Sequence, residues 1–232
     1  MSSTTPTPPQ ASLTERRKAE TRMEIARAAA GLFVRDGLRA TRAEDIAQAA
    51  GVAPRTFYRY FATKEEAVAP LYAAGAQRWV EAVRAAPASV SLPTALEDGV
   101  RHTLTPGVGV SASSWQWVRT LLRLAGANPS LRRVWAEVCR DSERMLGEVL
   151  AERVTRVPRT DGTPAADGAG DLAATPELRF AAAVASAAVR TALESWAEAD
   201  GPPEGPGSPC ELALRNLRAV RNFPWPGGGT QP

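Results

Sequence analysis

The chain has 232 residues, of which 44% are hydrophobic, enough for one large or two small globular domains. No apolar run is long enough to span a membrane, no secretory leader is recognisable, and two cysteines outside any CxxC pattern favour the reducing cytoplasm. The net charge of +3 is unevenly placed: residues 11–64 carry eleven Lys and Arg against six Asp and Glu, whereas the rest carries 17 against 19.

The N-terminal stretch begins with residues 1–11, whose Ser, Thr, Pro and Gln composition predicts disorder. Ser12 and Glu15 form a capping box that starts a helix running to about Asp36, where Gly37 ends it. A basic cluster follows the cap, with Arg22 one turn further on, and it either contacts the phosphates or the minor groove of a nucleic acid or is a solvated helix end. It consists of Arg16, Arg17 and Lys18.

Residues 41–64 predict two short helices joined by a tight turn. Thr41 and Glu44 have capping-box spacing and start the first helix, and Gly51 ends it, because glycine accepts the left-handed conformation of a helix C-terminus. Pro54 opens the second helix, at a position where proline is tolerated. Thr63 then caps a further helix, with Glu66 as its partner.

The second short helix has two different sides. Phe57 and Phe61 are four residues apart and face inward together, which leaves polar side chains pointing out. A helix of this kind, braced by a preceding helix, suits the major groove of DNA. The outward residues are Arg55, Thr56, Arg59 and Tyr60. The alternative is an ordinary helical hairpin in any all-α protein.

Two runs of sequence resemble the signature of the TetR family of bacterial transcription regulators. They are LFVRDGLRATRAEDIAQAAGVA and GVAPRTFYRYFATKEE, and the resemblance covers roughly residues 17–68. It implies a three-helix DNA-binding head, although Tyr60 and the pair Pro54-Arg55 depart from the family pattern. Within this head we predict that Arg55 and Thr56 read bases while Tyr60 and Lys64 anchor phosphates. The full set of DNA-binding candidates is Thr41, Arg42, Arg55, Thr56, Tyr58, Tyr60, Lys64, Arg16, Arg17 and Lys18.

The rest of the chain predicts further helices. A helix from Lys64 to about Ala86 contains Pro70 in its second turn, where a kink is expected unless the proline only sets a packing angle. The helix at 113–126 is apolar on most sides and should be buried. On it, Arg119 either meets an acidic ligand group in a cavity or lies at a solvated edge.

Two sets of residues are candidates for further sites in this helical part. Tryptophans on helices otherwise rich in alanine leave room for a ligand cavity, with the candidates Trp79, Trp115, Trp117, Trp135 and Arg119. Small residues on the helix at 175–198 permit close helix approach. The TetR resemblance implies that the last two helices form a dimer interface, with the candidates Ala181, Ala185, Ala188, Ala192, Leu214 and Leu217.

The sequence therefore predicts an all-α fold with an N-terminal helix-turn-helix domain and a helical ligand-binding and dimerisation domain. The expected boundaries are a disordered tail at 1–11, the DNA-binding domain at 12–66, the helical domain at 67–223 with flexible loops at 157–174 and 200–208, and a disordered tail at 224–232.

The predicted function is that of a cytoplasmic, homodimeric repressor, released from double-stranded operator DNA by a small hydrophobic effector. The stretch from 119 to 154 loosely resembles the acyl-CoA-responsive, mycofactocin-regulator-like branch of the family. A ligand-independent activator or architectural protein stays open. An enzyme is disfavoured because there is no Ser/His/Asp order, no phosphate loop and no metal-ligand cluster, and neither cofactor nor metal is expected.

Overall fold

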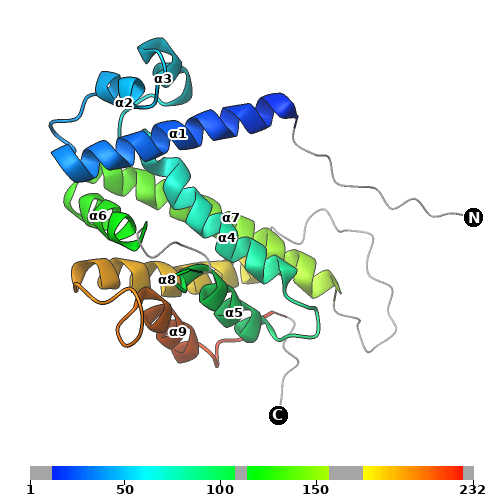
Figure 1. The fold of residues 1–232 in the computed structure, drawn as a ribbon. Helices are drawn as coiled ribbons and strands as arrows, with labels where there is room; N and C mark the ends of the chain where they lie inside the picture. The colour runs from blue at the N-terminus through cyan, green and yellow to red at the C-terminus, as the bar shows by residue number, and fades with distance from the viewer. Residues whose placement is uncertain (1–11, 108–113, 157–174, 227–232) are drawn as a thin grey trace, which may run out of the picture. The chain divides into compact units, whose positions relative to one another are not determined.

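The computed structural model describes residues 12–107, 114–156 and 175–226. The chain divides into two compact units, an N-terminal unit of Met1–Leu71 and a C-terminal unit of Tyr72–Pro232. The described residues form helices joined by turns, which confirms the prediction of an all-α fold (Figure 1). The predicted tail at 1–11 and the loop at 157–174 lie outside the described residues.

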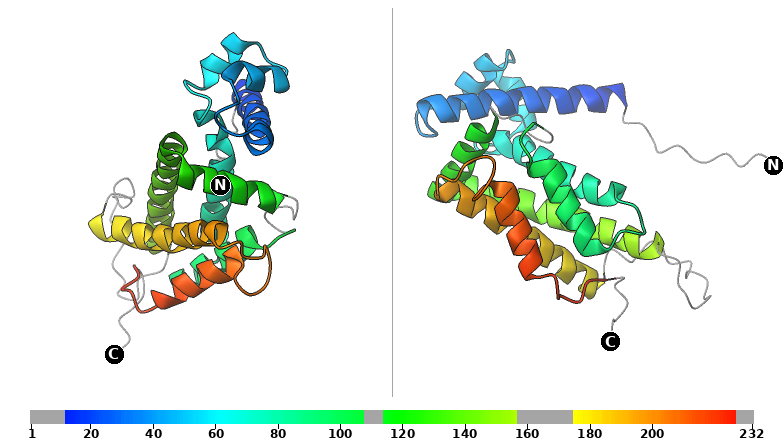
Figure 2. Two further views of the ribbon diagram at one scale, coloured as in Figure 1. Left: turned by 90° about the vertical axis from the view of Figure 1, so that its left-hand side faces the viewer. Right: turned by 60° about the horizontal axis from the view of Figure 1, so that its bottom comes forward.

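The N-terminal unit is built on one long helix, α1 (Leu13–Asp36). The helices α2 (Ala43–Ala49) and α3 (Pro54–Tyr60) lie together on one side of it, and a 3₁₀ turn, η1 (Glu66–Val68), follows (Figure 2). The predicted cap of α1 is confirmed, since the Ser12 hydroxyl accepts from the Glu15 N–H at 3.2 Å. The side chains buried between these elements are Ile25, Ala29, Phe33, Ile46, Phe57, Phe61 and Val68.

The start of α2 corrects the predicted capping box by one residue. Thr41 is buried and donates its hydroxyl hydrogen to the Gly37 carbonyl at 2.9 Å, so it cannot cap the helix. The N-cap is Arg42, whose backbone N–H donates to the Asp45 carboxylate at 2.8 Å. The corner after α1 needs a donor for the Gly37 carbonyl, and Thr41 supplies it.

The predicted kink at Pro70 is also wrong. The capping pair is present, because Thr63 accepts from the Glu66 N–H at 3.3 Å and the Glu66 carboxylate accepts from the Ala62 N–H at 3.0 Å. This pair closes the turn that leads into η1, however, and α4 (Ala69–Ala85) begins only after η1. Pro70 is thus the second residue of α4, where a helix has no hydrogen bond for proline to remove.

The C-terminal unit is a bundle organised around α8 (Pro176–Glu198), which packs against α6 (Ser114–Ala127), α7 (Pro129–Arg156) and α9 (Pro209–Ala219). The helix α5 (Leu92–Leu104) packs against α9 (Figure 1). The largest fully buried side chains of this unit include Trp196, Leu96, Leu131, Leu146, Leu150 and Val100.

A buried arginine ties α7 to α4 and to the turn that follows α4. Arg153 is 7% exposed, and its guanidinium donates to the carbonyls of Val83, Ala86, Pro87 and Val90. The carbonyls at the end of a helix have no partner within that helix, and a guanidinium with five donors can satisfy several of them at once.

The C-terminal segment extends the fold beyond the predicted boundary at 224. Trp225 is buried, its ring lies 4.8 Å from that of Phe223, and its indole N–H donates to the Val220 carbonyl at 3.2 Å. The large apolar area of an indole ring explains why a segment rich in proline and glycine still packs here. The predicted disordered tail therefore does not begin before residue 227, from which point the chain lies outside the described residues.

Candidate functional sites

The turn between α2 and α3 is held by backbone bonds around one glycine. Gly51 has φ +66°, in the left-handed region that favours glycine. The Gly51 N–H donates to the Gln48 carbonyl at 3.1 Å, and the Val52 N–H donates to the Ala47 carbonyl at 2.9 Å. These bonds close the end of α2 and direct the chain into α3.

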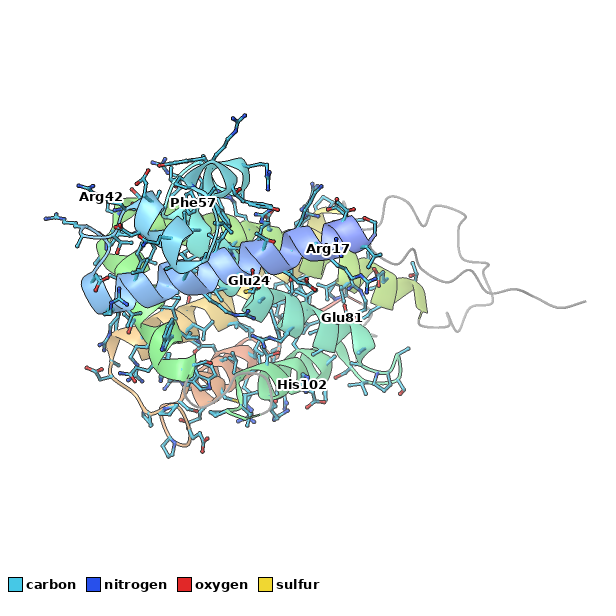
Figure 3. All side chains as sticks on the ribbon, turned by 45° about the horizontal axis from the view of Figure 1, so that its top comes forward. Arg17, Glu24, Arg42, Phe57, Glu81 and His102 are labelled. Atoms are coloured by element: carbon cyan, nitrogen blue, oxygen red, sulfur yellow. The ribbon has the colours of Figure 1, made fainter. Side chains whose placement is uncertain are left out.

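The α3 helix has the two sides that its sequence predicts. Phe57 and Phe61 are buried, with their ring centroids 5.7 Å apart. Thr56 and Tyr60 are half-buried, and the exposed side chains of the helix are Pro54, Arg55, Tyr58 and Arg59. Phe57 is fully buried and anchors the helix from its inner side, whereas Arg42 at the start of α2 is exposed; both residues are labelled in Figure 3.

Tyr58 is exposed but fixed in position by α2. Its phenolic O–H donates to the Glu44 carboxylate at 3.1 Å, and this hydrogen bond raises the pKa of Tyr58 above its usual value. The rings of Tyr58 and Phe57 are also nearly perpendicular, with their centroids 5.4 Å apart. With its hydrogen committed to Glu44, Tyr58 presents a ring edge and an acceptor oxygen to a ligand rather than a donor.

A groove of about 670 Å³ runs between the first half of α1 and the end of α3. Arg59 stacks on the ring of Tyr60 at 5.2 Å, and Lys18 is paired with Glu15 at 2.8 Å. Its lining residues are Glu15, Lys18, Ala19, Arg22, Arg59 and Tyr60. Three cations against one carboxylate make this groove positive.

Lys64 is bound to the backbone of the loop before α2. Its ammonium donates to the carbonyls of Leu38 at 2.6 Å and Thr41 at 2.7 Å. Two of its three N–H hydrogens are therefore used within the unit, which leaves one for a phosphate.

The arrangement as a whole suits the phosphate and base edges of DNA. The ion pairs described in the N-terminal unit join Lys18 to Glu15 and Arg35 to Asp36. In the described part of this unit, Arg42, Arg55 and Arg59 have no carboxylate partner, so their charge is available to phosphates or bases. Arg16 and Arg17 of the first turn of α1 are exposed as well.

Comparison with known proteins agrees with this geometry. Residues 25–69 match the family model "Bacterial regulatory proteins, tetR family". The chain is 31% identical over 226 residues to the HTH-type transcriptional regulator TcmR of Streptomyces glaucescens, covering 96% of this chain and 94% of TcmR. The chain belongs to the TetR family. This TetR-family protein is a DNA-binding transcriptional regulator, as its sequence predicts.

A solved structure shares the fold of this TetR-family protein over almost its whole length. It is FadR of Thermus thermophilus, a TetR-family transcriptional repressor in complex with lauroyl-CoA. The two proteins are 24% identical, with a TM-score of 0.52 and coverage of 91% of this chain and 98% of FadR.

The tryptophans predicted to line a cavity fall into different environments. Trp79 is a core residue, since its indole N–H donates to the Leu96 carbonyl at 3.4 Å and a Cβ at Gly99 would lie 3.1 Å from its ring. Trp135 is half-buried, with its N–H donating to Glu194 at 2.7 Å and its ring 5.1 Å from that of Tyr72. Trp117 is 43% exposed, which corrects the expectation that it faces an interior wall.

Trp115 and Arg119 both meet Trp196 on α8. The Trp115 and Trp196 rings are 5.3 Å apart and nearly perpendicular, and the Arg119 guanidinium carbon lies 4.3 Å over the Trp196 ring. Arg119 also donates to the Gly201 carbonyl, just after α8. Arg119 is therefore half-buried at a helix junction, and its solvated-edge interpretation does not hold.

The alanine stripe of α8 corrects the predicted dimer interface. Ala181, Ala185 and Ala192 are each at most 1% exposed within a single chain, because α8 packs them against its own neighbouring helices. Leu217 is buried in the same way, whereas Ala188 and Leu214 are half-buried. Close helix approach through alanine thus occurs inside the protomer.

Some residues that hold the candidate site residues in place could not be found from local sequence patterns. Glu44 lies 14 positions before Tyr58, and Gly201 lies 82 positions after Arg119, so only the folded chain brings each pair together. Within the described residues, no group of three or more His, Cys, Asp or Glu side chains is placed to hold a metal ion. No helix in that part of the chain combines the length and apolarity needed to cross a bilayer.

Proposed function

We propose that this TetR-family regulator is a homodimeric repressor that a small apolar ligand releases from its operator. The observation that carries the proposal is the set of arginines around α3 that have no carboxylate partner within the described residues. The fold of the chain is also similar to that of the repressor FadR, whose structure is a complex with lauroyl-CoA. A repressor of this kind needs one surface for DNA and a second site whose occupancy changes the DNA affinity.

In this proposal, α3 enters the major groove and its neighbours hold the backbone. Arg55, Thr56 and Tyr58 face the bases, with the ring edge of Tyr58 suited to a thymine methyl group. The phosphate contacts come from Tyr60, the third hydrogen of Lys64, and the exposed cations Arg16, Arg17, Lys18 and Arg42. Thr41 is left out because its side chain is buried.

The proposed dimer uses the accessible side of α8 together with α9. Phe180 is 62% exposed, and by helical spacing it shares one face of α8 with Val184, Ala187 and Thr191, all exposed or half-buried. Ala188 lies on the same face by the same spacing, and Leu214 is a half-buried residue of α9. We expect Val184→Arg to dissociate the dimer in sedimentation velocity, and Arg179→Ala, on another side of α8, to leave it intact. A Val184→Arg protein that sediments like the wild type would contradict this interface.

The proposed ligand site lies in the C-terminal unit, with α6 as one wall. Trp115, Leu121 and Leu122 make the inner side of α6 apolar. The half-buried Arg119 supplies a polar group on the same helix, whereas the Trp135 N–H is already donated to Glu194. An apolar site with a few placed donors is the usual form of a small-molecule pocket.

The test begins with genomic fragments selected by the purified protein, which supply the operator. Fluorescence anisotropy then follows the operator complex during titration with lauroyl-CoA, dodecanoate and an aromatic polyketide. We expect at least one of these ligands to raise the Kd of the operator complex. Comparing the three ligands then shows which size of ligand the protein accepts. An operator complex that withstands every ligand would contradict ligand release and favour a ligand-independent regulator.

A further inference from the structure

The indole N–H groups of the C-terminal unit are satisfied with one exception. Trp79, Trp135, Trp196 and Trp225 donate to an acceptor, and Trp117 reaches solvent. Trp115 is only 2% exposed, and its indole nitrogen has no hydrogen-bond partner among the described residues. A buried N–H without an acceptor costs the fold free energy, so its presence calls for a reason.

A second unsatisfied donor lies one helical turn away. Arg119 spends one terminal nitrogen on the Gly201 carbonyl, and the other lies 3.8 Å from the Asp200 carboxylate. Its Nε atom is buried and, like the Trp115 indole nitrogen, has no partner among the described residues. Positions four apart share one side of a helix, and both side chains contact Trp196, so the two donors border the same region between α6 and α8.

The excess positive charge around Arg119 also favours an anion between α6 and α8. Arg123 pairs with Asp200 at 2.5 Å and donates to the Ala197 carbonyl at 2.6 Å. Arg119 and Arg123 therefore share the single carboxylate of Asp200, whose side chain is 75% exposed to screening water. One guanidinium charge is left without a buried counterion, and this charge is the half-buried Arg119.

We propose that the Trp115 and Arg119 N–H groups bind the carboxylate of an apolar acid. This inference rests on the proposed ligand-released function and specifies the polar end of its ligand. A carboxylate has two oxygens and accepts two donors at once, whereas an alcohol of equal length brings neither the charge nor the second acceptor. The apolar part lies along the inner side of α6, and Trp196 packs against both donors.

The test follows the Trp115 indole signal directly. Full-length protein labelled with ¹⁵N gives one indole signal for each tryptophan, and the signal that Trp115→Phe removes is that of Trp115. The probes are dodecanoate and 1-dodecanol, which differ only in the polar end. We expect dodecanoate to move the Trp115 indole proton downfield, as a new hydrogen bond does, and dodecanol to leave it in place.

Binding to the variants gives a second measure. Trp115→Phe keeps an aromatic ring and removes the N–H, so we expect dodecanoate to bind about tenfold more weakly, with little change for dodecanol. Trp117→Phe is the matched control, two positions away on the same helix, and it should bind both probes like the wild type. In the free protein, Trp115→Phe should raise the melting temperature because it removes an unsatisfied buried donor.

The outcomes separate this subsite from the proposed function. If dodecanoate releases the operator equally from Trp115→Phe and wild type, the subsite is overturned and ligand release stands. If dodecanoate moves the Trp115 signal and Trp115→Phe weakens binding while the operator complex persists, the subsite stands and ligand release by this compound fails. A Trp115 signal that no probe moves, or a Trp115→Phe protein no more stable than wild type, points to a resident water on the indole and overturns the proposal.

Discussion

The two units of this TetR-family regulator use arginine in opposite ways. Around α3, the arginines are exposed and lack carboxylate partners within the described residues, as Arg55 illustrates. In the C-terminal unit the arginines act as connectors: Arg153 binds four carbonyls, and Arg123 joins α6 to the end of α8. The same residue type thus has no carboxylate partner around α3, where we propose that DNA binds, and joins helices in the C-terminal unit.

This difference shows why composition alone places the DNA surface poorly. Most Arg residues of the chain lie outside the positively charged stretch 11–64, yet acidic partners and backbone carbonyls occupy many of them. Glu97, for example, lies within 3.5 Å of Arg101, Arg218 and Arg221. What decides whether an arginine reaches DNA is the partner it already has.

The largest expected effect comes from removing a connecting arginine. Arg153→Leu leaves the buried carbonyl of Val83 and three part-buried carbonyls without this donor, and we expect it to lower the free energy of unfolding by about 3 kcal/mol. Urea unfolding measures the loss. Arg144→Leu, which breaks only an exposed pair with Glu148, should cost less than about 0.5 kcal/mol. Equal effects of the two changes would remove the distinction between connecting and surface arginines.

An available arginine should instead affect recognition. Arg55→Ala should leave unfolding unchanged and reduce discrimination at one base pair by about 1–3 kcal/mol. Anisotropy with the operator and with single-base variants of it measures this change over a salt series. Arg144→Ala, in the other unit, serves as the control and should bind all of these duplexes normally. A uniform loss of affinity across all sequences would assign Arg55 to a phosphate.

The Gly51 turn tests whether the orientation of α3 depends on backbone conformation. Gly51→Ala forces a side chain into φ +66°, which should cost about 1–2 kcal/mol of stability although no atom lies within 4 Å of the added Cβ. Gly75→Ala, inside α4 and equally free of neighbours, should stabilise the protein by about 0.5–1 kcal/mol. Thermal unfolding of both variants decides the point, and a neutral Gly51→Ala would contradict the turn geometry.

Lys64 combines the two roles, because it is a cation near α3 whose ammonium already binds two backbone carbonyls. Lys64→Met keeps the aliphatic stem and loses two hydrogen bonds, so we expect the stability to fall by about 1 kcal/mol. Operator affinity should fall with it, because the loop before α2 loses its anchor. The salt dependence distinguishes the roles: a slope lower by about one unit identifies a phosphate contact, and an unchanged slope identifies a purely structural lysine.

The smallest expected effect is on the pH dependence of stability, through the carboxylate of Glu97 between α5 and α9. Burial raises the pKa of Glu97, but the hydrogen bonds from Arg221 and Arg101 and the charge of Arg218 outweigh it, so the pKa lies below its ordinary value of 4.5. A lowered folded-state pKa gives stability that is present above pH 4.5 and is lost as the pH falls through the folded value. Glu97→Gln should remove this part of the acid dependence in melting experiments between pH 3 and 6. An identical pH profile for the variant would show that Glu97 contributes nothing to it.

The sequence by itself determined the helices and the DNA-binding turn, because their signals are local. Capping residues, Gly51, and the inward pair Phe57 and Phe61 act within a few positions of one another, so their spacing predicts their geometry. The errors at Thr41 and Pro70 are shifts of a few residues, caused by a carbonyl at Gly37 and an intervening 3₁₀ turn that the spacing does not show.

Only the tertiary structure decided which side chains are free to act. The alanine stripe of α8 has the same spacing whether it packs inside the protomer or against a second copy, and only the neighbouring helices show that Ala185 is buried in the protomer. The sequence likewise does not show that the Trp115 N–H lacks an acceptor, or that Arg119 stacks on Trp196, 77 positions later in the chain. Burial and hydrogen-bond partners depend on residues distant in the sequence, and these two properties determine what a polar side chain can bind.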